Sequence, residues 1–193
     1  MKIIIIKYNA GNIMSVEFAL QRLGLDCEVT DDIKKISAAD KVIFPGVGEA
    51  STTMKFLREH KLVSLIKNLK QPVLGICLGL QLMCSHSEEG DVDCLGIFKE
   101  KIKRFEPKLK VPHMGWNNIY NIKSKLFDSS IENQYVYFVH SYYAETGEDT
   151  IATTDYIIPF SAALHKENFY ATQFHPEKSG EIGARILKNF VEL

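Results

Sequence analysis

The sequence lacks the features that mark membrane, secreted and nucleic-acid-binding proteins. Its isoleucine run at residues 3–6 is far shorter than the roughly 20 apolar residues that cross a bilayer. The N-terminus lacks the basic region, apolar segment and cleavage site of an export signal. Neither sign of charge is in excess, since 23 lysine and arginine residues face 24 aspartate and glutamate residues. We therefore expect no nucleic acid and no membrane as a partner.

Cysteine and the common cofactor motifs are scarce too. None of the four cysteines belongs to a Cys-x-x-Cys pair, so we predict no metal site. The glycine-rich residues 46–51 lack the third glycine of a dinucleotide-binding loop and the lysine of a phosphate-binding loop, and we expect no cofactor. With 46% hydrophobic residues, a chain of 193 residues can bury a core without disulfides. We expect free thiols and a cytoplasmic protein.

Apolar runs and amphipathic stretches alternate along the first 85 residues. The four consecutive isoleucines indicate a strand that is covered on both faces. An amphipathic helix is predicted at residues 12–23, with Asn12 as its N-cap and Gly24 as its stop. Further strands are predicted at residues 27–30, 41–44 and 73–76, and helices at 53–59 and 62–69. This alternation predicts an α/β fold with a mostly parallel central sheet flanked by helices.

The second half of the chain changes character. Residues 99–110 hold six basic and two acidic residues, a pattern typical of a solvated face, and residues 181–193 are patterned as an amphipathic helix. No repeat, low-complexity tract or linker interrupts the chain, so we expect one domain over residues 1–193. An additional antiparallel strand layer is predicted from short strand-like runs at residues 118–122, 135–139, 151–154, 162–165 and 169–173.

The most informative segment is the Gly-Ile-Cys-Leu-Gly-Leu-Gln sequence at residues 75–81. A buried strand runs into Cys77 and a helix-compatible stretch follows, so the thiol would project from the carboxyl edge of the sheet. Free N–H groups at the start of that helix would favour a thiolate and stabilise an oxyanion. An inert buried cysteine is the alternative. Cys84 would fall two turns further along the same helix face, where we interpret it as packing.

A thiolate needs a base, and His175 is the best candidate among six histidines. Pro176 disfavours helical backbone at His175, and an extended segment would put residues 175 and 177 on the same side. Glu177 could then fix the imidazole tautomer and stabilise the imidazolium, the third role in a Cys-His-acid triad. Alone, a His-Pro-Glu run is more often a surface turn, and its value here comes from its pairing with Cys77.

A glycine-rich turn, Pro-Gly-Val-Gly at residues 45–48, follows the neighbouring predicted strand. It lies at the carboxyl edge, where ligands collect in open α/β sheets. The amide of Val47 or Gly48 could join the amide of Leu78 to form an oxyanion hole with two donors.

Together these motifs resemble the triad-type, class I glutamine amidotransferases, a resemblance that implies a flavodoxin-like glutaminase fold. In order along the chain from residue 3 to residue 193, the sequence is similar to the glutaminase subunits of imidazole glycerol phosphate synthase. The Pro-His-Met-Gly-Trp-Asn segment is the most specific of the matching motifs. These are Tyr-Asn-Ala-Gly-Asn at residues 8–12, Pro-Gly-Val-Gly at 45–48, Pro-His-Met-Gly-Trp-Asn at 112–117, Phe-Val-His-Ser-Tyr at 138–142 and Gln-Phe-His-Pro-Glu-Lys at 173–178.

The resemblance implies hydrolysis of L-glutamine to glutamate and ammonia through a cysteinyl thioester. Cys77 matches the nucleophile, His175 the base and acid, and Glu177 the orienting carboxylate. The ammonia would pass to a cyclase partner with a (β/α)8 barrel fold, which forms a heterodimer with the chain and makes imidazole glycerol phosphate and AICAR in histidine biosynthesis. Residues implied to hold glutamine are Gly46, Gln81, Glu89, Ser141 and Tyr142. Residues implied to face the partner are Asn12, His113, Met114, Trp116, Asn117 and Lys178.

One departure and several alternatives accompany this resemblance. Many relatives have Asp-Tyr-Gly where this chain has Lys7, Tyr8 and Asn9, which affects the expected interface rather than the triad. Taken alone, Trp116 is typical of a core aromatic. The acidic loop at residues 88–93 is typical of a solvated segment, in which only Glu89 is a functional candidate. Three other functions fit parts of the pattern: a glutaminase for another synthase, such as a sugar-aminating enzyme, an α/β cysteine hydrolase or redox sensor, and a non-catalytic flavodoxin-like binding module.

Overall fold

The computed structural model describes residues 1–8 and 12–193, and residues 9–11 lie outside the described part. The helices are α1 (Ile13–Arg22), α2 (Ile33–Ser37), α3 (Ala50–Glu59), α4 (Leu62–Asn68), α5 (Leu78–Met83) and α6 (Gly180–Glu192), with short 3-10 turns η1 (Ser129–Ile131) and η2 (Pro176–Lys178). The strands are β1 (Ile3–Ile6), β2 (Cys27–Thr30), β3 (Lys41–Phe44), β4 (Val73–Ile76), β5 (His86–Ser87), β6 (Val92–Asp93), β7 (Lys101–Arg104), β8 (His113–Asn118), β9 (Tyr135–His140), β10 (Tyr142–Ala144), β11 (Thr150–Tyr156), β12 (Ile158–Lys166) and β13 (Phe169–Thr172).

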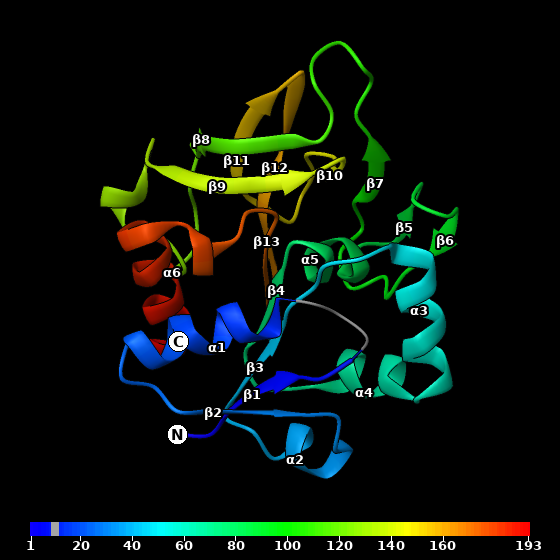
Figure 1. The fold of residues 1–193 in the computed structure, drawn as a ribbon, viewed down its shortest axis with the longest axis vertical. Coiled ribbons are helices and arrows are strands. Elements are labelled where there is room, and N and C mark those ends of the chain that lie inside the picture. Colours follow the sequence, from blue (N-terminus) through cyan, green and yellow to red (C-terminus); the bar gives the residue numbers. More distant parts are fainter. Residues whose placement is uncertain (9–11) are drawn as a thin grey trace.

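In the described part of the chain, eleven of these strands form one mixed sheet, flanked by helices (Figure 1). Its order is β2-β1-β3-β4-β13-β12-β10-β7-β5-β6, and β11 pairs with β12. Strands β1 to β4 and β13 run parallel, whereas β12 pairs antiparallel with β13, β10 and β11. The sheet therefore changes from parallel to antiparallel at β13, and the predicted α/β fold with an antiparallel addition is confirmed.

The isoleucines of β1 show why the parallel half needs helices on both faces. Ile3 and Ile5 pack into the core that α1 and α6 share, while Ile4 and Ile6 pack into the core of α2, α3 and α4. Successive side chains of a strand point to opposite faces, so a run of four isoleucines is stable only where both faces are covered. All four are at most 2% exposed.

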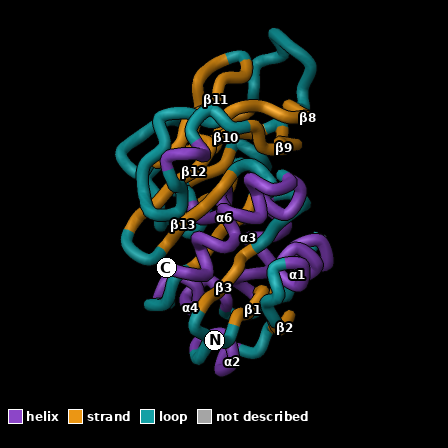
Figure 2. Tube along the Cα trace, turned by 90° about the vertical axis from the view of Figure 1, so that its left-hand side faces the viewer, coloured by secondary structure: helices purple, strands orange, loops and turns teal. Residues whose placement is uncertain are grey.

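Strands β8 and β9 form a separate two-stranded antiparallel sheet. It lies near β11 at one end of the molecule, whereas β1, β2 and α2 lie at the other end (Figure 2). Within the described residues, every helix is too short or too polar to cross a lipid bilayer.

Some predicted elements differ from the observed ones. The predicted strand at residues 118–122 is wrong, because β8 ends at Asn118 and Asn121 has a left-handed backbone with φ of 53°. Helix α5 ends at Met83, so Cys84 is an extended residue after the helix; it is fully buried, as its interpretation as packing requires. Asn12 occupies the N-cap position of α1, but its side chain makes no capping hydrogen bond. The sequence reasoning missed α2, the short strands β5, β6, β7 and β10, and all of β8 except its last residue.

Candidate active site

Cys77 lies in the sharp turn between β4 and α5, with φ of 54° and ψ of −105°. A non-glycine residue with this backbone carries strain of about 1–3 kcal/mol, which persists only where the surroundings hold it. Gly79 is part of those surroundings, because a Cβ at this position would lie 2.0 Å from the backbone oxygen of Phe44. The first turn of α5 thus rests directly on the end of β3. The predicted strand-to-helix turn at Cys77 is present.

His175 reaches Cys77 because β13 is the parallel neighbour of β4. The amide of Cys77 donates to the carbonyl of Thr172 at 2.8 Å, and the chain then continues to His175. The Nδ1 atom of His175 lies 2.7 Å from Oε1 of Glu177, and both side chains are almost completely buried. The backbone differs from the predicted extended run, since Pro176 and Glu177 lie in the 3-10 turn η2. That turn brings the carboxylate of Glu177 back to Nδ1 of the imidazole.

The charges around His175 favour its protonated form. Burial alone would lower the pKa of His175, but the side chains of Cys77 and Glu177 outweigh it and raise that pKa to about 10. Because Nδ1 is bound to Glu177, Nε2 is the nitrogen that remains for Cys77 and a reacting group.

The amide Nδ2 of Asn12 also donates to Oε1 of Glu177, at 2.5 Å. The side chain of Asn12 therefore holds the carboxylate instead of capping α1.

One of the amides predicted to form the oxyanion hole, that of Leu78, is already engaged by another partner. The N–H of Leu78 donates to the carbonyl of Gly46 at 3.3 Å. In a planar trans peptide the carbonyl and the following N–H point in opposite directions, so the N–H of Val47 points away from Leu78. The hydroxyl of Tyr8 donates to the carbonyl of Pro45, one residue earlier in the same loop. Gly46 is required here, since a Cβ would lie 2.5 Å from that hydroxyl.

A cavity of about 340 Å³ opens in front of Cys77. Its lining includes all three backbone candidates for the oxyanion hole and four of the five predicted glutamine-binding residues; the fifth, Gly46, contacts Leu78 through its carbonyl. Burial raises the pKa of Glu89 despite a hydrogen bond from the amide of Ala50 at 2.8 Å. The lining residues are Val47, Gly48, Cys77, Leu78, Gln81, Glu89, Pro112, Val139, His140, Ser141, Tyr142, His175 and Lys178.

Sequence reasoning missed four residues of this site, Pro112, Val139, His140 and Gln173. Gln173 lies beside the thiol, with Nε2 at 3.7 Å from Sγ of Cys77, and its Oε1 accepts a hydrogen bond from Gln81 at 3.1 Å. The signal for Gln173 was its position two residues before His175. His140 lines the cavity and is only 6% exposed. Its signal was the Phe-Val-His-Ser-Tyr motif, which was used only for the two residues that follow the histidine.

The residues predicted to face a partner divide into two groups. Met114 and Trp116 project outward from β8 and are 59% and 55% exposed, so the alternative of Trp116 as a core aromatic is wrong. His113 lies on the other face of the same strand, is 4% exposed and cannot contribute its side chain to an outer surface. Asn117 is half-buried beside it, with its amide 2.9 Å from the carbonyl of Asp155. Lys178 is exposed at the rim of the cavity.

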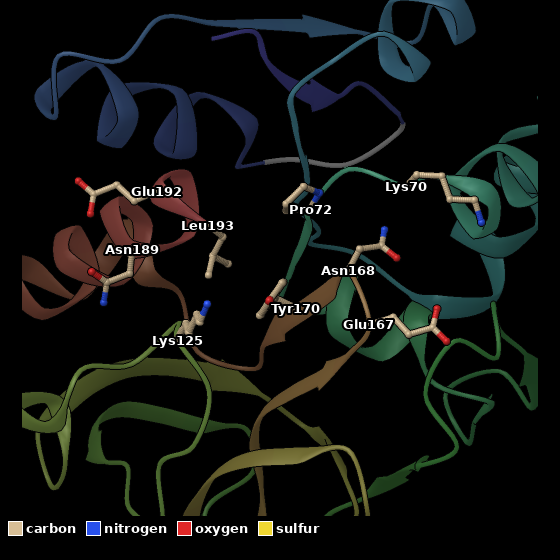
Figure 3. Close-up of a pocket in the computed structure, with 9 residues that line it drawn as sticks. All are labelled: Lys70, Pro72, Lys125, Glu167, Asn168, Tyr170, Asn189, Glu192 and Leu193. Carbon is tan, nitrogen blue, oxygen red and sulfur yellow. The ribbon is translucent and has the colours of Figure 1, made fainter.

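A second hollow, of about 500 Å³, lies at the opposite edge of the sheet (Figure 3). Its residues Pro72 and Asn168 directly precede β4 and β13, whereas Cys77 and His175 follow these strands. The hollow contains no cysteine or histidine, so it offers none of the chemistry described above. In the described part of the chain, no group of three or more His, Cys, Asp or Glu side chains is arranged to hold a metal ion.

Comparison with known proteins agrees with this geometry. The sequence pattern of the family Glutamine amidotransferase class-I matches residues 5–193. The chain is 65% identical to the imidazole glycerol phosphate synthase subunit HisH of Bacteroides fragilis, over 100% of both chains. It is 50% identical to the HisH subunit of Haemophilus influenzae, over 98% of this chain and 96% of that one.

The fold is also similar to that of solved structures. The crystal structure of a putative GMP synthase protein from Thermoplasma acidophilum superposes with a TM-score of 0.77 and 20% identity, over 100% of this chain and 92% of that one. A crystal structure described as a glutamine amidotransferase superposes with a TM-score of 0.74 and 17% identity, over 98% of this chain and 97% of that one. At these identities the likeness concerns the fold alone.

Proposed function

Because this chain belongs to the class I glutamine amidotransferases, and among them to the HisH glutaminase subunits of imidazole glycerol phosphate synthase in histidine biosynthesis, we propose that it hydrolyses L-glutamine through Cys77. The observation that carries the proposal is the buried set of Cys77, His175 and Glu177 at the base of a cavity. A nucleophile, a base and a group that orients the base are what acyl transfer requires.

In the first half of the reaction, the Cys77 thiolate attacks the side-chain amide carbon of glutamine, and the carbonyl electrons move onto its oxygen. As this oxyanion collapses, the C–N bond breaks. Nε2 of the protonated His175 gives its proton to the nitrogen, which leaves as ammonia. Glu177 holds Nδ1 throughout, so the proton is exchanged at Nε2 alone.

In the second half, neutral His175 takes a proton from water while the water oxygen attacks the thioester carbon. The second oxyanion collapses, the C–S bond breaks, and glutamate leaves. Cys77 is again a thiolate and His175 is again protonated, so the site returns to its starting state. The raised pKa of His175, about 10, supports the protonated imidazole of that starting state.

The cavity supports glutamine as the substrate. We assign the α-ammonium group to Glu89, because this half-buried carboxylate is the acidic side chain that lines the cavity. We assign the backbone of Ser141 and Tyr142 to the amino-acid end of glutamine. Gln81 supports that backbone, since its Nε2 donates to the carbonyl of Tyr142 at 3.0 Å. Gly46, with no side chain, leaves room beside Leu78.

We further propose that the isolated chain is nearly idle. Turning over the peptide between Gly46 and Val47 would release the N–H of Leu78 and direct the N–H of Val47 into the cavity. In the unflipped state at least one oxyanion donor is missing, which costs about 2.7–4 kcal/mol, or about a hundred- to a thousandfold in rate. The neighbouring Gly48, with φ of 129°, accommodates backbone that other residues rarely adopt.

In our proposal, the partner that ends this idle state is a cyclase subunit with the (β/α)8 barrel fold, which forms a heterodimer with the chain. Residues 1–193 form one amidotransferase domain, and the protein is cytoplasmic. Met114 and Trp116 supply exposed apolar area on β8, and Lys178 is exposed at the cavity rim. Asn12, which is also expected to face the partner, bonds to Glu177 of the triad. The ammonia would then pass to the synthesis of imidazole glycerol phosphate and AICAR.

Glutamate release tests this function, measured for the chain alone and with the ligand-bound cyclase subunit. We expect slow hydrolysis alone and at least a hundredfold acceleration in the complex. In Trp116→Ala, the partner concentration that gives half of the full acceleration should rise more than tenfold, as expected when a buried aromatic anchor is lost. Ile33→Ala, at an exposed site on α2, is the matched control and should behave like the wild type. Equal rates with and without partner would contradict the idle state, and no hydrolysis in either would contradict the function.

A further inference from the structure

A chain of hydrogen bonds runs from β8 to the glutamine pocket through two buried histidines. The amide Nδ2 of Asn117 lies 3.5 Å from Nε2 of His113. The Nδ1 atom of His113 lies 3.3 Å from Nε2 of His140, and Nδ1 of His140 lies 2.7 Å from the carbonyl oxygen of Tyr142. His113 and His140 are directly opposite each other in the β8–β9 register, which is what brings the rings together.

The acceptor at the end of this chain determines the tautomer of both rings. A carbonyl oxygen only accepts, so Nδ1 of His140 carries the proton and its Nε2 has the lone pair. That lone pair requires a proton on Nδ1 of His113, and Nε2 of His113 then accepts from the amide of Asn117. Every hydrogen bond points toward Tyr142, and the pattern holds only if both histidines are neutral.

The surroundings keep both rings neutral. His113 is stacked against Tyr156, with ring centres 4.0 Å apart, and against Phe138 at 5.0 Å. Burial lowers the pKa of His113 to about 4. Burial also lowers the pKa of His140, to about 3, against the hydrogen bond to the carbonyl of Tyr142, which raises it; the positive charge of His175 opposes protonation of His140 further.

The carbonyl of Tyr142 thereby receives two hydrogen bonds, one from Nδ1 of His140 and one from Nε2 of Gln81. Both of its lone pairs are occupied, so this oxygen has no capacity left for a substrate. Its contribution is to hold the backbone at Ser141 and Tyr142, and the amide of Gln81, in one orientation. Preorganisation of this kind lowers the cost of binding a ligand.

We propose that His140 is a positioning residue of the glutamine pocket, held in its Nδ1-protonated form by His113 across the β8–β9 pair. The proposal rests on the glutaminase function and names the residues that preorganise its substrate end. His140 acts through Tyr142 and Gln81, so its loss should raise KM for glutamine far more than it lowers kcat.

Two isosteric variants separate positioning from packing. The amide nitrogen of asparagine can replace Nδ1 of histidine, whereas the amide oxygen of glutamine can replace Nε2. His140→Asn keeps the donor to Tyr142, and His140→Gln keeps only the acceptor for His113. In the complex with the ligand-bound cyclase subunit, we expect KM for L-glutamine to stay within about threefold of wild type in His140→Asn. In His140→Gln it should rise about tenfold, the effect of one lost hydrogen bond, with kcat within about threefold.

The matched control is His165→Gln, because the Nε2 atom of His165 contacts only the carbonyl of Glu167 in an exposed position. It should leave KM unchanged. An equal rise in KM in both His140 variants would show that the ring acts by packing, and no rise in either would show that the hydrogen bond to Tyr142 is dispensable. Either result overturns the proposal.

A measurement on the unaltered chain covers the case in which the variants fail to fold. The ¹⁵N chemical shifts of the histidine rings at pH 7 distinguish a protonated nitrogen from one with a lone pair. We expect His113 and His140 both to be neutral with the proton on Nδ1. A proton on Nε2 of His140 would overturn the proposal even if the wild-type complex hydrolyses glutamine. An inactive wild-type complex would instead contradict the underlying function and leave the tautomers to be judged separately.

Discussion

Two regions of the molecule bury their strands in different ways. Every side chain of β1, β3 and β4 is buried, because helices cover both faces of the parallel half. In β8, by contrast, buried or half-buried residues alternate with the exposed Met114 and Trp116. The parallel half is a rigid support that places one thiol, whereas the β8–β9 sheet has one face in the core and one toward solvent. Met114 and Trp116, which we assign to the partner surface, lie in the second kind of region.

The candidate site lies where the two regions meet. Cys77 comes from the parallel half, and His140 and Tyr142 come from the antiparallel part. His175 follows β13, the strand that is parallel to β4 on one side and antiparallel to β12 on the other. Changes at Cys77 and His175 should therefore affect the reaction itself, and changes at His140 and Tyr142 should affect binding.

The largest effect is expected from Cys77→Ala. The variant has no group that can form the thioester, so glutaminase activity should fall by at least about 10⁴-fold. Cys84→Ala should stay within a few-fold of wild type, since its thiol is fully buried in the hydrophobic core and donates to the carbonyl of Leu80. Glutamate release by the complex with the cyclase subunit measures both. A reversed outcome would refute the assignment of the nucleophile.

Glu177→Gln should come next. Loss of the carboxylate removes the charge that favours protonated His175, so we expect kcat to fall about a hundredfold. Binding of glutamine should be unaffected, because Glu177 does not line the cavity. Calorimetry in the inactive Cys77→Ala background, with and without Glu177→Gln, checks this directly. If the second change abolishes binding, Glu177 is a substrate ligand.

A smaller effect, on stability, is expected from Gly79→Ala. The new methyl group would overlap the carbonyl of Phe44, and we expect the free energy of unfolding to fall by about 3 kcal/mol. Gly96→Asn is the control: its φ of 64° suits asparagine and no atom lies within 4 Å of the added Cβ. Urea unfolding of both variants measures the difference. Comparable losses would mean that the close approach of α5 to β3 is not tightly constrained.

The smallest expected effect is on the pH dependence of stability, and it comes from two histidines of the antiparallel part. The pKa values of His113 and His140 are lower in the folded chain than the ordinary value near 6.5, so the unfolded chain binds more protons below that pH. Their contribution to stability is therefore lost as the pH falls from about 6.5 toward 4. His140→Asn removes one of these groups, and its Tm should drop a few degrees less than that of wild type between pH 7 and pH 5. Parallel Tm curves would contradict the neutral pair.

The same comparison explains what the sequence could predict. Continuous apolar runs identified β3 and β4 with their observed ends, and β1 by its four isoleucines, because burial on both faces leaves a pattern that needs no knowledge of partners. The turn at Cys77 and the pairing of His175 with Glu177 were also predicted from local sequence. The predicted strand at residues 118–122 was wrong, since half-buried strands depend on which neighbour they pair with.

Other features depend on contacts between distant residues, which local sequence does not reveal. The amide of Leu78 is engaged by the carbonyl of Gly46, and the side chain of Asn12 bonds to Glu177 instead of capping α1. His113 was predicted at an interface, but the alternation along β8 turns its side chain inward. These contacts depend on the order of strands in the sheet, and the spacing of residues along the chain does not predict that order.

The pairing of β13 with β4 has a consequence for synthesis of the chain. A ribosome makes Cys77 on the order of ten seconds before His175, at about 5–20 residues per second. During that interval the nascent chain contains the nucleophile without its base, its orienting carboxylate or the strand that brings them near. An unfinished chain, or one truncated before β13, cannot release ammonia from glutamine.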